Sequence, residues 1–217
     1  MKFVQLLAVL FFIPLCAEAQ GASAVGKPEL YREANVKKLI EKYDVIYAKV
    51  DALTEGSKTW VPMEADVHIC TAVPLEKIKA VITDYDNYTG IFRRSTASRI
   101  LSRDARGTTA FFEITVGAMG VTVVTAYTVL LETPLDSPGK FLLTFSHAGD
   151  NGSIRKVYGF WYLESIMIDG KPYTYLRYYS TSEPLRVNVL QRQITSWFIG
   201  SEYGSMLKDV ITAAGRR

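Results

Sequence analysis

The sequence predicts an α+β domain in which a curved antiparallel sheet wraps around one long C-terminal helix. From Ser95 to Ser182 the chain reads as consecutive strands, with apolar residues at every second position. Short segments of turn-forming residues separate these strands, so neighbouring strands are expected to pair antiparallel as a meander. From Val187 to Ala214 the apolar residues instead recur at helical spacing. A long sheet buries such a helix only if it curls around it, which leaves a space between the two.

The composition of the chain is that of a globular protein. Of its 217 residues, 48% are hydrophobic and 22% charged, which is too apolar for intrinsic disorder. Two Cys exclude a disulfide scaffold. The 25 Lys and Arg nearly balance the 22 Asp and Glu. The net charge of +3 therefore does not indicate a nucleic-acid-binding protein. We therefore expect one domain with an aromatic interior.

The first residues read as a targeting signal. Lys2 precedes an apolar run of about 13 residues, and Ala17-Glu18-Ala19 then supplies a small-x-small pattern. This run is shorter than the roughly 20 residues that a membrane span requires. We expect a secretory signal peptide over residues 1–19, cut after Ala19, and a periplasmic or secreted mature protein. A membrane anchor and a lipoprotein acylated at Cys16 are the alternatives.

The mature chain is expected to form a flexible tether at residues 20–28 and a single domain over residues 29–215. Two helices are predicted in the first part of this domain. Residues 29–43 have an amphipathic pattern, and residues 74–83 form a helix with Pro74 in its first turn.

The strands are bounded by turn chemistry, of which Asp169-Gly170 is the strongest two-residue hairpin signal. Residues 54–58 read as another turn, and residues 84–88 end the second helix with turn-forming and aromatic side chains. The predicted strands span residues 44–53, 60–73, 95–103, 108–116, 121–132, 140–147, 155–168 and 173–182.

Two segments of the sequence resemble a known superfamily. Residues 73–88 (Val-Pro-Leu-Glu-Lys-Ile-Lys-Ala-Val-Ile-Thr-Asp-Tyr-Asp-Asn-Tyr) and the strand at 98–101 resemble the start of START-like/polyketide-cyclase (SRPBCC) proteins. Gly159-Phe-Trp-Tyr-Leu163 resembles their G-x-W-x-L strand. The resemblance covers about residues 44–214. It departs from the usual pattern at Thr71-Ala-Val-Pro74 and Ile91-Phe-Arg-Arg94, which leaves the subfamily open.

The resemblance implies a helix-grip fold with a deep apolar cavity between the sheet and the C-terminal helix. Proteins of this superfamily carry sterols, phospholipids, quinones or polyketides, and a minority catalyse cyclisation or related chemistry. A shared fold does not establish function, so the residues that would line the cavity need separate consideration.

Alternation along each strand indicates which side chains face the helix. This inward set combines aromatic and aliphatic side chains with scattered hydroxyls and one imidazole. Tyr85, Tyr127, His147 and Tyr178 are the polar positions that would orient a ligand, whereas Arg177 falls on the outward face. His147 ends a strand beside a Gly-rich loop, which fits either a cavity mouth or an ordinary edge position. The candidate ligand-binding residues are Tyr85, Phe112, Ile114, Val123, Tyr127, Phe145, His147, Trp161, Tyr178, Trp197, Gly200, Ser201 and Gly204.

Small residues gather in the middle of the predicted C-terminal helix. Gly200, Ser201, Gly204 and Ser205 lie together there, although a glycine inside a helix costs about 1 kcal/mol relative to Ala. Such residues either leave volume for a ligand or let another element approach closely, and the sequence does not decide between these readings.

We predict an exported soluble carrier that binds a lipid-like molecule, such as a sterol, hopanoid, phospholipid or fatty acid, for lipid transfer. The expected partners are this ligand and, transiently, a membrane surface; we expect a monomer that binds no nucleic acid. No cofactor is expected, and no zinc site is expected either, because the chain has only His68 and His147, in separate segments, and no Cys pair. No Gly-x-Ser-x-Gly or P-loop motif occurs, so no catalytic residue is assigned.

Two alternatives stay open. The chain would be a cyclase- or hydrolase-type enzyme of the same fold if His147 or Glu113 served as a base next to the ligand. It would be a protein-interaction module if the core were filled and an apolar patch were exposed.

Overall fold

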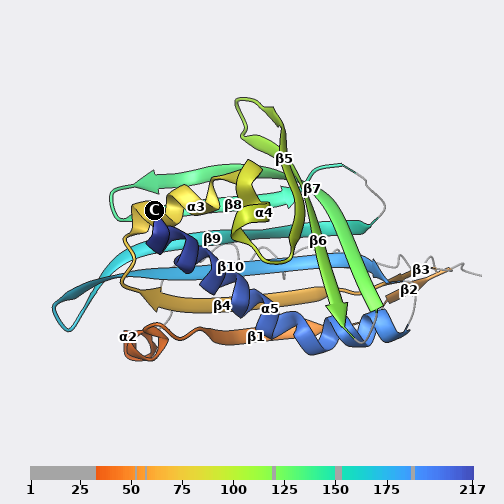
Figure 1. Ribbon diagram of the computed structural model, residues 1–217, viewed down its shortest axis with the longest axis horizontal. Coiled ribbons are helices and arrows are strands. Elements are labelled where there is room, and N and C mark those ends of the chain that lie inside the picture. Colours follow the sequence, from red (N-terminus) through yellow and green to blue (C-terminus); the bar gives the residue numbers. More distant parts are fainter. Residues whose placement is uncertain (1–32, 52, 57, 119–120, 150–152, 187–188) are drawn as a thin grey trace, which may run out of the picture.

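The computed structural model describes residues 33–51, 53–56, 58–118, 121–149, 153–186 and 189–217 (Figure 1). Side chains are described for the same ranges except residues 33–34, 46–50, 117–118, 121, 186 and 189–200. The predicted signal peptide at 1–19, with Cys16, and the predicted tether at 20–28 lie outside the described residues. Within the described part of the chain, no helix has the length and apolar character that crossing a membrane requires.

An antiparallel sheet of ten strands curves around helix α5 (Val189–Arg216), which crosses its concave face (Figure 1). The order across the sheet is β1-β4-β10-β9-β8-β7-β6-β5, and β2 and β3 form a hairpin beside β10. This arrangement confirms the predicted α+β class and the curved sheet around a long terminal helix. The strands are β1 (Asp44–Val50), β2 (Leu53–Glu55), β3 (Lys58–Trp60), β4 (Met63–Thr71), β5 (Ser95–Arg103), β6 (Thr108–Ala118), β7 (Val121–Ser137), β8 (Lys140–His147), β9 (Ile154–Ile168) and β10 (Lys171–Arg186).

Turn chemistry sets most strand ends, as predicted. Asp169 and Gly170 both have positive φ, 51° and 75°, as the two-residue hairpin between β9 and β10 requires. Strands β7 and β10 run past their predicted ends even though they contain Pro134 and Pro184. The pairing register shifts at each of these prolines, so each proline lies where the ladder is already interrupted.

Within its described part, the predicted helix over residues 29–43 is confirmed only as far as Leu39. The structure has only α2 (Glu33–Val36) and a 3₁₀ turn η1 (Lys37–Leu39). Glu41 follows with a φ of 54°, and its N–H donates to the carbonyl oxygen of Cys70 at 2.8 Å. Contact with the end of β4 therefore outweighs the helical propensity of this segment.

The predicted second helix is confirmed as α3 (Leu75–Ile82), and η2 (Tyr85–Asn87) and α4 (Tyr88–Ile91) follow it. Helix α3 packs against α5, and the Arg217 side chain donates to the Ala80 carbonyl oxygen and to Asp84. The last turns of α5 are thereby fixed at one end of the sheet. The apolar face of α3 consists of Leu75, Ile78, Val81 and Ile82, all buried.

Two apolar layers cover the two faces of the sheet. The concave layer lies between the sheet and α3 and α5. The convex layer was not foreseen; it contains Cys70, whose burial raises the pKa of its thiol to about 12. Arg177 faces this convex side, as expected, and its guanidinium binds the Asp66 carboxylate. The main side chains of the convex layer are Val36, Leu39, Phe160, Tyr162, Tyr175 and Tyr179.

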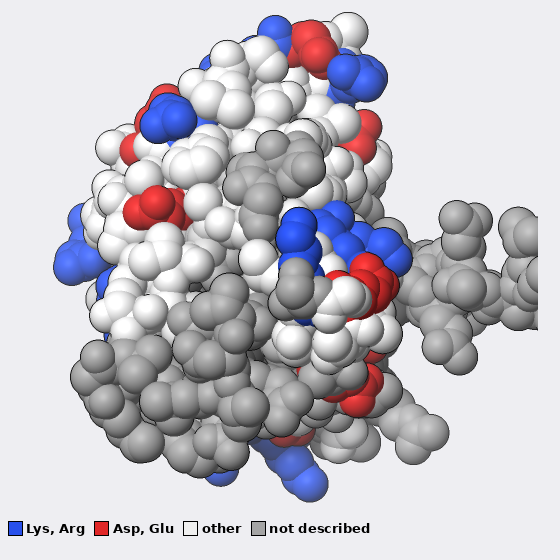
Figure 2. Space-filling model, turned by 90° about the vertical axis from the view of Figure 1, so that its right-hand side faces the viewer, with Lys and Arg blue, Asp and Glu red and all other residues white. Residues whose placement is uncertain are grey.

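Charges of both signs are interspersed on the surface. Figure 2 shows basic and acidic side chains next to each other on the face that it presents. Arg155, for example, binds both Glu55 and Glu183, at 2.7 and 2.5 Å. This mixture agrees with the near balance of charges in the sequence.

Candidate functional site

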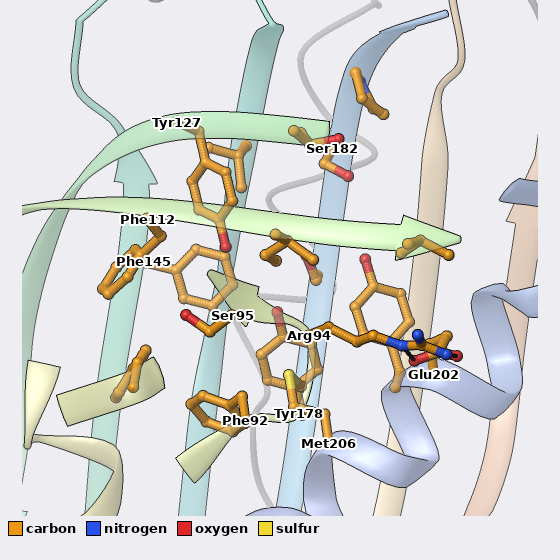
Figure 3. Close-up of a pocket in the computed structure, with 18 of the residues that line it drawn as sticks. Phe92, Arg94, Ser95, Phe112, Tyr127, Phe145, Tyr178, Ser182, Glu202 and Met206 are labelled. Atoms are coloured by element: carbon orange, nitrogen blue, oxygen red, sulfur yellow. Dashed lines mark hydrogen bonds and ion pairs between the residues drawn. The ribbon is translucent and has the colours of Figure 1, made fainter. Parts of the chain in front are cut away.

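A cavity of about 230 Å³ lies between the concave face of the sheet, α5 and the segment that follows α4 (Figure 3). Strands β6 to β10 supply most of its wall, and the wall is predominantly aromatic and aliphatic. Period-2 alternation places these side chains on one face, as predicted. Seven of the predicted candidates line it: Phe112, Ile114, Val123, Tyr127, Phe145, Trp161 and Tyr178.

Gly159 allows the aromatic wall to pack tightly across β9. A Cβ at this position would lie 2.6 Å from Phe145 Cζ and 2.1 Å from the Tyr179 carbonyl oxygen. The Phe145 ring therefore lies over the glycine and stacks on Tyr178, with centroids 5.9 Å apart. Trp161 packs on the same Tyr178 ring at 4.4 Å. This contact gives a physical reason for the glycine and tryptophan of the G-x-W-x-L segment.

Tyr88 and Phe92 extend the wall from the helical side. The Tyr88 ring stacks on Phe112 at 4.9 Å and meets Phe92 edge to face at 4.6 Å. The Tyr88 hydroxyl donates to the Ile82 carbonyl oxygen at 2.5 Å, which fixes the ring against α3. Neither residue was among the candidates, although Tyr88 closes the recognised 73–88 segment.

Hydroxyl groups provide the uncharged polar atoms of the wall. Burial raises the pKa of the Tyr127 and Tyr178 phenols, and the neighbouring Tyr203 raises both further. These groups are therefore neutral hydrogen-bond donors at ordinary pH. The Tyr178 hydroxyl bonds to Ser180, which also lines the cavity.

Two ion pairs connect the segment after α4 to α5 at the cavity rim. Arg94 Nη2 lies 2.9 Å from Glu202 Oε1, and Arg93 Nη2 lies 2.7 Å from Asp209 Oδ1 (Figure 3 shows the Arg94 pair). These hydrogen bonds raise the pKa of both guanidinium groups. Among the lining residues that the structure describes, these four are the charged ones, so the rim is electrically neutral. Sequence reasoning missed both pairs.

Two polar candidates lie outside the cavity wall. Tyr85 is buried in the core beside Tyr88, with ring centroids 6.0 Å apart, and burial raises the pKa of its phenol to about 12. His147 is half-buried at the end of β8, opposite Val129. Its Nε2 is buried and has no hydrogen-bond partner within the described ranges. The expectation that Tyr85 and His147 line the cavity is therefore not met.

The small residues of α5 were expected either to leave volume for a ligand or to let another element approach closely. Ser201 faces solvent, and Gly204 is buried against Tyr43, whose Cε2 would lie 2.3 Å from an added Cβ. Gly204 therefore serves close packing rather than ligand space. Trp197 and Gly200 lie outside the residues whose side chains the structure describes. The α5 residues on the cavity wall are Glu202, Tyr203, Ser205, Met206 and Asp209.

The described residues offer little for acid–base or metal chemistry. Within them, no group of three or more His, Cys, Asp or Glu is placed to hold a metal ion. Glu113, the second base considered, lies off the wall and accepts a hydrogen bond from Thr96 at 2.7 Å. The two carboxylates that do line the cavity are bound to arginines.

Solved structures share this fold at low sequence identity. A STAR-related lipid transfer protein from Xanthomonas axonopodis has a TM-score of 0.56 at 10% identity, covering 78% of this chain and 99% of its own. Human StAR-related lipid transfer protein 5 gives 0.52 at 12%, covering 80% and 88%. The Zhui aromatase/cyclase from Streptomyces sp. R1128 gives 0.52 at 15%, covering 72% and 95%. No protein-family model and no curated protein matches the chain. The likeness confirms the expected START-like helix-grip fold.

Proposed function

We propose that this protein binds a lipid-like hydrophobic molecule in the cavity and carries it between sites. The observation that carries the proposal is the wall itself, which is aromatic and aliphatic, with hydroxyls inside and a neutral rim. Each 100 Å² of apolar ligand surface removed from water contributes roughly 2.5 kcal/mol to binding. Such a wall favours apolar ligands without requiring a charged group.

The size of the cavity bears on the ligand. Its volume of about 230 Å³ exceeds the roughly 150 Å³ of an apolar cavity that holds benzene. It is below the roughly 300–1,000 Å³ of usual ligand pockets. One acyl chain segment or a two-ring group therefore fits the cavity as it stands, whereas a larger lipid requires the wall to open.

The rim is the proposed place of opening. The side chains of Arg93 and Arg94 are 56% and 40% exposed, so water competes for both ion pairs. Exposed pairs of this kind contribute about 0–1 kcal/mol each. Separating the segment after α4 from α5 therefore costs little compared with the binding of an apolar ligand.

Transfer is favoured over catalysis on two grounds. Two of the similar structures are named lipid transfer proteins, and the acid–base candidates His147 and Glu113 lie off the cavity wall. We also propose that the mature protein acts outside the cytoplasm, which rests on the signal pattern in residues 1–19. N-terminal sequencing of the exported protein tests that part, with Gln20 as the expected first residue.

Ligand extraction tests the proposal. Protein purified from its own source without detergent is extracted with organic solvent, and the extract is analysed by mass spectrometry. We expect one class of lipid-like molecule in near-stoichiometric amount, recovered unchanged after incubation with the protein. Conversion of the molecule would favour the enzyme alternative. An empty protein that also binds no added apolar probe would refute the proposal.

A further inference from the structure

Some of the hydroxyl groups near the cavity already make hydrogen bonds within the protein, and others do not. The Tyr178 hydroxyl bonds to Ser180, and the Tyr88 hydroxyl donates to the Ile82 carbonyl oxygen. These groups are already committed to the protein.

Tyr127 differs from them. Its ring packs against Phe112 with centroids 5.9 Å apart, and its side chain lines the cavity. Figure 3 shows its oxygen pointing into the cavity, away from β7. This hydroxyl makes no hydrogen bond to any residue that the structure describes. Tyr127 is half-buried, so its hydroxyl is available to a hydrogen-bond acceptor on a molecule that enters the cavity.

The surroundings of this hydroxyl indicate an uncharged acceptor. Burial and the nearby Tyr203 phenol both raise the pKa of the Tyr127 phenol, so Tyr127 stays neutral. The arginines of the rim are bound to Glu202 and Asp209, so neither is available to neutralise an anion beside Tyr127. A buried carboxylate or phosphate there would lack a counter-charge, which is strongly unfavourable.

We propose that the Tyr127 hydroxyl donates a hydrogen bond to an uncharged oxygen of the ligand. The ligand class is thus an apolar molecule with a ketone, quinone, ester or hydroxyl oxygen near the middle of the cavity, and not a free carboxylate. This inference rests on the proposed function, because it requires that the cavity binds a ligand at all.

Three two-ring probes of similar shape test the inference. They are 2-acetylnaphthalene, its hydrocarbon counterpart 2-isopropenylnaphthalene, and 2-naphthoate, each titrated at pH 7.5 into the wild-type protein and two variants. Tyr127→Phe removes the hydroxyl and keeps the ring. Tyr85→Phe is the matched control, since Tyr85 is a buried phenol off the cavity wall. Thermal melts verify that both variants fold.

We expect Tyr127→Phe to weaken ketone binding about three- to tenfold, the value of one net hydrogen bond, and to change hydrocarbon binding less than twofold. Tyr85→Phe should change neither affinity, and 2-naphthoate should bind the wild type at least tenfold more weakly than the ketone. Equal effects of Tyr127→Phe on both neutral probes, or tighter binding of the carboxylate, would overturn the inference while leaving the cavity as a binding site. If the wild type bound none of the probes, the proposed function itself would fail.

Discussion

The Arg94 guanidinium lies against the Glu202 carboxylate in a two-point contact, with Nη2 2.9 Å from Oε1 and Nε 3.2 Å from Oε2. Arg93 makes the same kind of contact with Asp209 one residue earlier. Together the two pairs hold the segment after α4 against α5 beside the cavity. The rim is thus closed by contacts that water and salt weaken, whereas the wall is held by buried aromatic packing.

Glu202→Gln should speed ligand release without unfolding the protein. The change removes one ion pair, so the rim separates more often, and we expect the dissociation rate of 2-acetylnaphthalene to rise roughly two- to fivefold. Stopped-flow fluorescence measures this rate. Added salt should accelerate release from the wild type more than from the variant. Lys140→Gln is the control, because the Lys140–Glu164 pair at 3.3 Å involves no residue of the cavity wall. Equal release from the wild type and Glu202→Gln would show that the rim is not the barrier.

Gly204→Ala should destabilise the fold by about 1–3 kcal/mol, because the added Cβ would overlap the Tyr43 ring at 2.3–2.7 Å. Urea denaturation measures the loss. Gly215→Ala is the matched control near the end of the same helix, where an added Cβ meets no atom within 4 Å. It should be neutral or slightly stabilising. If both variants had the same stability, the close contact between α5 and Tyr43 would be wrong.

Asp66→Asn should destabilise the protein by about 3 kcal/mol at neutral pH, because it removes the counter-ion of the buried Arg177 guanidinium. Burial alone would raise the pKa of the Asp66 carboxyl, but hydrogen bonds from His68 and Arg177 outweigh burial and lower it below 3.8. The carboxylate therefore stabilises the fold above its unfolded-state pKa. This contribution is lost as the pH falls through 3.8 and the lower folded-state value.

Urea denaturation of the wild type and of Asp66→Asn between pH 7 and pH 3 checks this sign. The gap in unfolding free energy between the two proteins should be widest at pH 7 and should narrow toward pH 3. Asp136→Asn is the control, since Asp136 is 49% exposed and pairs with Lys79 on the surface. It should cost less than about 1 kcal/mol. A gap that widened toward acid pH would contradict the account of the Asp66 site.

Local sequence patterns predicted the strands and much of the cavity wall. Alternation fixes the face of a side chain wherever a strand is regular, which is why Phe112, Tyr127 and Trp161 were placed correctly. The same rule does not apply in the turns between α3 and β5. There Tyr85 was chosen, whereas Tyr88, three positions later, reaches the cavity.

Contacts between distant segments were not predictable in this way. Arg94 and Glu202 are 108 positions apart, and nothing in either local pattern relates them. The sequence allowed Gly204 to serve either ligand space or close packing, and only the position of Tyr43 beside it decides for close packing. The helix predicted over residues 29–43 ends early for the same reason, since the Glu41 N–H donates to the carbonyl oxygen of Cys70 at the end of β4.

Occupying the cavity with a side chain tests the central claim most directly. Thr125 lines the cavity on β7, and Val124, its neighbour in the chain, points to the opposite face and is 50% exposed. Isothermal titration of 2-acetylnaphthalene compares Thr125→Phe with the control Val124→Phe, each first shown to be folded. We predict that Thr125→Phe weakens binding at least tenfold and that Val124→Phe keeps the wild-type affinity. Unchanged binding by Thr125→Phe would contradict the assignment of this cavity as the ligand site.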